Sequence, residues 1–209
     1  MTEVTPDLLL RAYAYGLFPM ADSADSPELY WFDPPMRGIL PLDGFRVSRS
    51  LRKAIRQDRF EIRFDTAFRD VVRHCAAPAP NRPKTWINDR ILTLYATLHD
   101  AGYAHSVECW KDNGLVGGLY GVALKGAFFG ESMFSHATDA SKVALAYLVA
   151  GLRENGFALL DTQFTTAHLA RFGGHEIPQA DYKARLARAL TLDARLRPPS
   201  EAALDELLR

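Results

Sequence analysis

Net charge of either sign is missing from this sequence. Its 25 Lys and Arg residues balance 25 Asp and Glu residues, which leaves a formal net charge of zero. A chain without an overall positive field does not indicate a nucleic-acid partner by its charge. Any contact with phosphate groups therefore has to come from a local basic patch.

Cysteine is also scarce. The two cysteines, Cys75 and Cys109, lack the paired spacing of metal ligands and a secretory context. They could be grouped with His74 and His105 as a metal set, yet His105 and Cys109 lie four residues apart on an expected strand. We therefore expect free thiols in a reducing compartment and no metal site.

Long apolar segments are missing as well. The first 16 residues carry acidic side chains and lack the basic start and apolar run of a signal peptide, and no later segment is long enough to span a bilayer. The 209 residues, 48% of them hydrophobic, suffice for one good-sized domain, or for one domain with a small extension. We expect a soluble, cytoplasmic protein with a substantial core.

The stretch at 117–135, GGLYGVALKGAFFGESMFS, is apolar almost throughout and still contains a carboxylate. Its aromatic and branched residues predict two strands joined by a turn at Lys125 and Gly126. Glu131 lies in the second strand, between a glycine and a serine. A carboxylate in such a segment needs a partner, and it is either part of a functional site or a structurally paired charge.

The other segments predict a sheet of mainly antiparallel strands with flanking helices. Further strands are predicted at 38–42, 60–64, 105–110 and 157–160. Helices are predicted at 6–15, 48–57, 67–75, 89–101, 139–156 and 166–172, and from 181 onward. The tail at 197–209 is expected to be a loosely attached helix.

Several of the connecting segments are distinctive. The sequences ADSADSPE at 21–28 and APAPNRPK at 77–84 suit exposed loops, the first of them mobile. The segment at 30–37 combines three aromatic residues with two prolines, and it either walls a pocket or packs a small N-terminal domain onto a larger one. Trp86 precedes the helix at 89–101. Its side chain either packs in the core or forms a platform on which a ligand stacks.

One expected helix, which Ser48 or Ser50 can cap, carries a basic face. The face consists of Arg49, Arg52, Lys53 and Arg56. It is either a solvated helix surface or a contact for phosphate groups.

Asp161 and Gln163 lie two residues apart at the end of an apolar strand, hence on one face. The carboxylate can accept a hydrogen bond from the carboxamide, directly or through one water. Polar residues at such a strand end are well placed to face a crevice, although a satisfied polar strand end is the alternative.

Two other patterns resemble functional motifs, but neither has the structural context that its motif requires. Ser132 with His136 and Asp139 lacks the strand-to-helix elbow of a nucleophile triad. Residues 153–158 match an Arg-x-x-Gly-x-Ala pattern that binds the pyrophosphate of coenzyme A. Here the pattern closes a helix and precedes a strand, the reverse of the context that frees backbone N–H groups, so the match is interpreted as accidental.

A set of ordered motifs resembles the bacterial leucyl/phenylalanyl-tRNA–protein transferases. The motifs are YGLFP at 15–19, Trp31 with Pro34 and Arg37, SRS at 48–50, TWI at 85–87, AHSVE at 104–108, LVGGLYGV at 115–122, GESMFS at 130–135, ASK at 140–142, and Asp161 with Gln163. They extend from the first helix to Tyr182, and their order and number make the resemblance specific.

The resemblance implies an enzyme that moves Leu or Phe, with Met as a third candidate, from aminoacyl-tRNA to proteins with an N-terminal Arg or Lys. That transfer marks the acceptor for degradation by the N-end rule. The implied fold is α+β, with a small N-terminal domain at 1–36 and a GNAT-like (acyl-CoA N-acyltransferase-like) domain at 37–209 built on a mixed, mainly antiparallel sheet. We expect a monomer with no metal, no organic cofactor and no membrane contact.

Carried over residue by residue, the resemblance assigns Asp161 and Gln163 to the catalytic pair and Glu131 to a pocket carboxylate. Trp86 is similar to the platform on which the terminal adenine of the tRNA stacks, and Tyr13 to another residue of that pocket. The apolar cavity for the aminoacyl side chain would be lined by Leu119, Phe128, Gly130, Met133, Leu145, Leu148 and Leu160.

The implied reaction is aminolysis of an activated ester, which needs a neutral amine, an aligned carbonyl and a route for the proton. A carboxamide is a very weak base. We therefore expect Asp161 to fix and polarise Gln163, whose carbonyl oxygen orients the attacking amine. Glu131 would hold the amine or the cationic side chain of the acceptor, and the proton would leave through water or the terminal ribose hydroxyl.

Three positions depart from the family pattern. Met20 stands where some members have a second stacking tryptophan, Thr162 replaces a frequent cysteine, and Gln179 replaces an arginine.

Two alternative functions stay open: a GNAT-like transferase with another donor or an acidic N-terminal acceptor, and a non-catalytic RNA-binding module. The intact carboxylates and carboxamide argue against the module, which would not need them.

Overall fold

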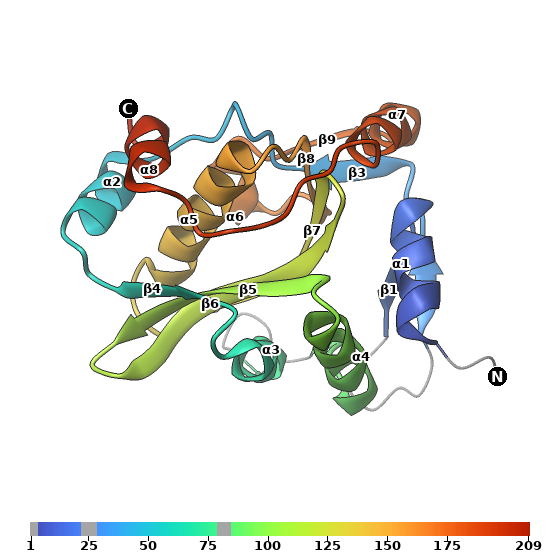
Figure 1. Ribbon diagram of the computed structural model, residues 1–209, viewed down its shortest axis with the longest axis horizontal. Helices are drawn as coiled ribbons and strands as arrows, with labels where there is room; N and C mark the ends of the chain where they lie inside the picture. The colour runs from blue at the N-terminus through green and yellow to red at the C-terminus, as the bar shows by residue number, and fades with distance from the viewer. Residues whose placement is uncertain (1–3, 22–28, 79–84) are drawn as a thin grey trace.

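The computed structural model describes residues 4–21, 29–78 and 85–209 (Figure 1). Most of the two loops expected at 21–28 and 77–84 lies outside these residues. The helices are α1 (Pro6–Ala14), α2 (Arg49–Arg56), α3 (Phe68–Ala76), α4 (Asp89–Asp100), α5 (Ala140–Glu154), α6 (Ala167–Ala170), α7 (Gln179–Ala189) and α8 (Glu201–Leu207). The strands are β1 (Phe18–Met20), β2 (Tyr30–Phe32), β3 (Met36–Ile39), β4 (Glu61–Phe64), β5 (Ala104–Lys111), β6 (Gly114–Leu124), β7 (Ala127–Ser135), β8 (Leu159–Gln163) and β9 (His175–Pro178).

Seven strands form one sheet in the order β4-β5-β6-β7-β8-β3-β9, and β1 pairs with β2 separately. The neighbours in the large sheet pair antiparallel, except that β7 and β8 run parallel. The predicted α+β class and the mixed, mainly antiparallel sheet are therefore confirmed. The β6–β7 hairpin turns at Lys125 and Gly126 as predicted, with Lys125 at a φ of 55°.

Helices cover both faces of the sheet, as Figure 1 shows for α5 on one side and α3 and α4 on the other. The face under α5 has a core in which Leu148 and Val107 are buried. The opposite face has a second core, to which α1, α3 and α4 contribute Tyr13, Val71 and Ile91. β7 supplies residues to both cores because successive strand residues point to opposite faces.

The N-terminal segment packs against the second core. Thr5 caps α1 with its hydroxyl, Pro6 opens the helix, and Gly16 follows its end with a φ of 82°. Tyr13 is fully buried while Tyr15 is 74% exposed, so the two side chains point to different faces. The chain then forms β1 and β2 and enters the large sheet as β3, between β8 and β9.

Three features differ from the sequence predictions. The β1–β2 pair and β9 were not predicted, because β1 and β9 each contain a proline and show no alternation of apolar and polar residues. The tail helix α8 is firmly attached: Leu207 and Leu208 are 7% and 2% exposed, and α8 packs on α5. Among the described residues, none of the helices has the length and apolar character that a bilayer crossing requires.

Candidate active site

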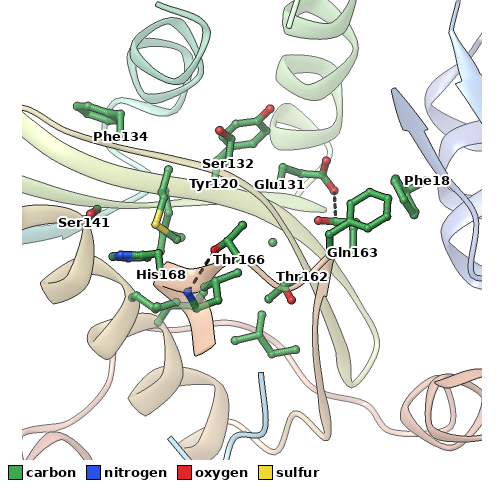
Figure 2. Close-up of a pocket in the computed structure, with 18 of the residues that line it drawn as sticks. Phe18, Tyr120, Glu131, Ser132, Phe134, Ser141, Thr162, Gln163, Thr166 and His168 are labelled. Atoms are coloured by element: carbon green, nitrogen blue, oxygen red, sulfur yellow. Dashed lines mark hydrogen bonds between the residues drawn. The ribbon is translucent and has the colours of Figure 1, made fainter. Parts of the chain in front are cut away.

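A cavity of about 510 Å³ opens where β7 and β8 separate (Figure 2). The two strands pair from Ala127–Phe129 against Leu159–Asp161, and past this point residues of both strands line the cavity. Helices α5 and α6 contribute further lining residues. Figure 2 shows Glu131 and Gln163 toward one end of the cavity and His168 and Ser141 toward the other.

Six of the seven residues expected around the aminoacyl side chain lie on the wall of this cavity. They are Leu119, Gly130, Met133, Leu145, Leu148 and Leu160. Phe128 corrects the expectation, because its side chain is fully buried in the core under α5 and does not reach the lining. Its ring packs over Gly121, where an added Cβ would lie 2.5 Å from a ring carbon.

A bulge in β7 determines the direction of Glu131. Gly121 of β6 pairs with Gly130, and Tyr120 pairs with Ser132, so Glu131 is an extra residue between two paired positions. The bulge lets the carboxylate point toward α1 and α4, while the methionine two residues later packs against the core under α5. One strand thereby supplies both the carboxylate and the apolar wall.

Glu131 receives hydrogen bonds from three elements. The hydroxyl of Tyr13 in α1 donates to Oε1 at 2.6 Å, and that of Tyr95 in α4 donates to Oε2 at 2.9 Å. The carboxamide Nε2 of Gln163 in β8 lies 3.4 Å from Oε1, as the dashed line in Figure 2 marks. The carboxylate is therefore not a lone buried charge.

Burial raises the pKa of Glu131 to about 7, and the charge of Asp161 adds to the rise. The hydroxyls of Tyr13 and Tyr95 and the charge of Arg37 lower this pKa in part. The geometry agrees with a bound proton. The two tyrosine oxygens lie 2.6 Å apart, so three oxygen contacts share two hydroxyl protons, and a proton on Glu131 would supply the third.

Asp161 is fully buried and held by a buried cation. The Arg37 guanidinium donates from Nε to Oδ1 at 3.0 Å and from Nη2 to Oδ2 at 2.6 Å, a bidentate pair. The hydroxyl of Tyr182 donates to Oδ2 at 2.7 Å, and the backbone N–H of Gln163 donates to Oδ1 at 2.8 Å. Both oxygens of the Asp161 carboxylate therefore accept hydrogen bonds.

The link between Asp161 and Gln163 differs from the one expected. Asp161 accepts from the backbone N–H of Gln163, and the carboxamide of Gln163 points to Glu131 instead. The reason is the left-handed backbone of Gln163, whose φ is 57° and which interrupts the strand alternation on which the expectation was based. The pair is therefore connected through the main chain.

The remaining predicted binding residues divide into two groups. Trp86 and Met20 line the cavity and also pack against the second core, so the structure accommodates both alternatives for Trp86. Tyr13 lies behind the lining and reaches the site through Glu131. Thr162, which replaces a cysteine frequent in the family, lies on the cavity wall.

The basic face lies on α2, which packs against α5 near the C-terminal helix (Figure 1). Ser48 caps α2 through the backbone N–H of Leu51 at 3.2 Å. Arg52 is half-buried and donates to the carbonyl of Arg209 at 3.3 Å. The other three cations are exposed: Arg49, Lys53 and Arg56. Their contact with tRNA stays a prediction.

Sequence reasoning missed Arg37, Tyr95 and Tyr182 as parts of the site. Arg37 appeared in a family motif without a role, and each tyrosine occurs in a helix where an amphipathic pattern does not distinguish a packing residue from a carboxylate partner.

The nucleophile triad that the sequence analysis rejected, Ser132 with His136 and Asp139, is not assembled. His136 contacts His74 at 3.0 Å, and Asp139 pairs with Lys142 at 2.7 Å.

An apolar cavity with a carboxylate of raised pKa and a carboxamide at one end is typical of the binding site of an enzyme. Residues 39–187 match the family model described as leucyl/phenylalanyl-tRNA protein transferase, and residues 2–35 match the model of its N-terminal domain. The chain belongs to the leucyl/phenylalanyl-tRNA–protein transferase family.

Curated relatives agree with this membership. A protein named leucyl/phenylalanyl-tRNA–protein transferase from Paramagnetospirillum magneticum is 60% identical over 91% of both chains. A protein of the same name from Rhodospirillum rubrum is 57% identical over 91% of this chain and 89% of its own.

Solved structures are more distant. L-PGS from Bacillus licheniformis has a TM-score of 0.42 and 14% identity, over 77% of this chain and 53% of its own. The C-terminal domain of a putative lysylphosphatidylglycerol synthetase from Agrobacterium fabrum has a TM-score of 0.41 and 14% identity, over 94% of this chain and 73% of its own. These likenesses are too weak to carry an argument.

Proposed function

We propose that this protein transfers Leu or Phe, with Met as a third candidate, from aminoacyl-tRNA to the α-amine of proteins that begin with Arg or Lys. The transfer would mark those proteins for degradation by the N-end rule. Family membership supports the donor and the reaction. The observation that carries the proposal at the level of the site is the location of Glu131 and Gln163 at the end of an apolar cavity.

The cavity wall supports an apolar aminoacyl side chain that is not branched at Cβ. Leu119, Leu145 and Leu148 give it a flexible aliphatic surface. A polar side chain would lose its hydrogen bonds to water on entry. Size alone discriminates weakly, because a missing methylene is worth about 1–3 kcal/mol. The proposed preference for Leu and Phe over polar residues is therefore stronger than any preference between the two.

The proposed chemistry is direct aminolysis. The neutral α-amine of the acceptor attacks the ester carbonyl, the new C–N bond forms, and the bond to the ribose oxygen of the terminal adenosine breaks. The amine loses one proton and the departing ribose oxygen gains one. Glu131, with its pKa near neutrality, is suited to hold that proton between the two steps.

Gln163 and Asp161 take different roles in this proposal. The carboxamide of Gln163 lies beside Glu131, where it can orient the amine through its carbonyl oxygen. Asp161 already accepts hydrogen bonds from three side-chain or backbone partners, so it fixes Gln163 and does not take a proton itself.

The donor would be bound by its terminal adenosine and its phosphates. Stacking of the adenine on Trp86, with Met20 as a softer second contact, is supported by the location of both side chains on the cavity wall. The exposed cations of α2 would contact the tRNA backbone. We propose that the protein acts in the cytoplasm as a monomer.

A division into a small N-terminal domain at 1–36 and a GNAT-like catalytic domain at 37–209 is part of the proposal. The support for the GNAT-like assignment is the parallel pair of β7 and β8, whose strands separate to open the substrate cavity.

A panel of acceptor peptides tests the function. Purified protein is incubated with leucyl-tRNA and peptides that begin with Arg, Lys, Asp or Glu, and added leucine is read by mass. We expect addition to the Arg and Lys peptides. Addition to the acidic peptides alone would indicate another acceptor class. A parallel reaction with leucyl-coenzyme A tests the donor, and no addition from either donor would favour a binding module.

A further inference from the structure

Arg37 is the most deeply buried cation of the site, with 1% of its surface exposed. Its guanidinium lies between two aromatic rings, 4.4 Å from the centroid of Phe18 and 4.5 Å from that of Tyr182. Nη1 donates to the carbonyl of Gly16 at 2.9 Å. Arg37 thus connects the N-terminal segment, β3, β8 and α7 around the carboxylate of Asp161.

This arrangement occupies the acceptor positions of Asp161. Oδ1 accepts from Arg37 at 3.0 Å and from the backbone of Gln163 at 2.8 Å, while Oδ2 accepts from Arg37 at 2.6 Å and from Tyr182 at 2.7 Å. A carboxylate saturated by donors on both oxygens is an anchor. The group that it anchors is the main chain of Gln163.

Gln163 needs such an anchor because its backbone is strained. A φ of 57° is uncommon for a residue other than glycine and persists where the surroundings fix it. The same conformation directs the carboxamide toward Glu131, at 3.4 Å. A contact of this length is sensitive to small displacements of the backbone, and in aligned sites about 1 Å of misplacement can cost about a hundredfold in rate.

We propose that Arg37 and Tyr182 are positioning residues of the transfer reaction, which act through Asp161 to hold Gln163 in the left-handed conformation that aims its carboxamide at the reacting amine. The inference rests on the proposed function. Neither residue lines the substrate cavity, so neither is expected to contribute to the binding of the aminoacyl group.

A double-mutant cycle separates positioning from mere structural support. Tyr182→Phe removes one hydrogen bond to Asp161 and keeps the ring on Arg37. We expect kcat to fall about tenfold and KM for leucyl-tRNA to stay within about twofold, because orientation is lost and binding is kept. In a Gln163→Ala background, Tyr182→Phe should leave kcat unchanged. Tyr147→Phe, which alters a half-buried tyrosine of α5, is the matched control.

The results of this cycle distinguish failure of the positioning role from failure of the proposed function. An equal loss of kcat from Tyr182→Phe in both backgrounds, or a loss of thermal stability with kcat unchanged, overturns the positioning role. Arg37→Lys keeps the charge and loses the bidentate contact, and the same cycle applies to it; if it does not fold, Tyr182→Phe alone carries the test. Wild-type protein that transfers no leucine to an Arg peptide would instead overturn the proposed function itself.

Discussion

At the scale of single residues, the proposed mechanism depends on the protonation state of Glu131. Burial raises its pKa to about 7, compared with about 4.3 for an exposed glutamate. A carboxyl group with a raised pKa is protonated below that value, and it can accept a proton only above it. The rate of transfer should therefore rise as the pH increases through about 7.

A comparison with Glu131→Gln tests this pH dependence. Single-turnover rates of leucine transfer are measured for both proteins from about pH 5.5 to about pH 8.5, and their ratio is plotted. The acceptor amine titrates equally in both reactions and cancels. We expect the ratio to rise up to about pH 7 and then level at about 10²–10⁴, the usual contribution of a general base. A ratio that is flat over the whole range would contradict the role of Glu131.

At the scale of elements, helices α1 and α4 each contact Glu131 of β7 through one tyrosine. The hydroxyls of Tyr13 and Tyr95 stabilise the charged form of Glu131 and lower its pKa. Tyr13→Phe and Tyr95→Phe should each raise that pKa and move the inflection of the rate profile to higher pH. Tyr103→Phe, at an exposed tyrosine, should leave the inflection in place. An unchanged or lower inflection in both variants would mean that the hydroxyls do not tune this carboxylate.

The helix α5 forms one wall of the cavity, and its residues should set the choice of amino acid. Leu145→Phe adds volume to this wall, so transfer of Phe should fall by more than transfer of Leu, with a change in their ratio of about tenfold. Leu152→Phe on the same helix is buried away from the cavity and serves as the control. It should lower stability without changing the ratio. A constant Leu to Phe ratio in Leu145→Phe would remove α5 from the pocket.

Regular elements could be predicted from the sequence because their period is local. The apolar spacing of α5 and the β6–β7 hairpin around Lys125 are confirmed for this reason. The bulge at Glu131 could not be predicted, since it depends on how β6 and β7 align in register. Phe128 faces the same core under α5 as Met133, but it lies where β7 and β8 are still paired, and it does not reach the lining.

The polar residues of the candidate site were predicted from the sequence, and the side chains that hold them in place were not. Glu131 and Gln163 were found because polar residues in apolar strands are conspicuous. Their partners lie far away in the chain: Tyr13 is 118 residues from Glu131, and Arg37 is 124 residues from Asp161. Contacts over such separations depend on the tertiary fold and leave no local pattern in the sequence.

At the scale of the whole molecule, the absence of net charge leaves phosphate binding to local patches. The exposed cations of α2 lie at one end of the molecule, and α7 lies at the other (Figure 1). We expect the affinity for leucyl-tRNA to fall as salt rises. Arg49→Gln combined with Lys53→Gln should reduce the slope of log affinity against log salt by about 1.4–1.8, since each phosphate contact contributes about 0.7–0.9.

The matched control for α2 removes two exposed cations of α7. Arg185→Gln combined with Arg188→Gln changes the net charge by the same amount and should leave the salt slope unaltered. Equal effects of the two double variants would indicate a general charge effect, and tRNA binding that is independent of salt would contradict the patch altogether.

Elements from distant parts of the chain meet at the candidate reaction centre. Helix α1, strand β3 and helix α7 each place a side chain on Glu131 or Asp161. The most direct test of this centre is the rate of leucine transfer from leucyl-tRNA to a peptide that begins with Arg, measured for the wild-type protein and for Gln163→Ala with matched thermal stability. We predict transfer by the wild type and a loss of about a hundredfold or more in the variant. A wild-type protein without transfer, or a variant at the full rate, would contradict the account.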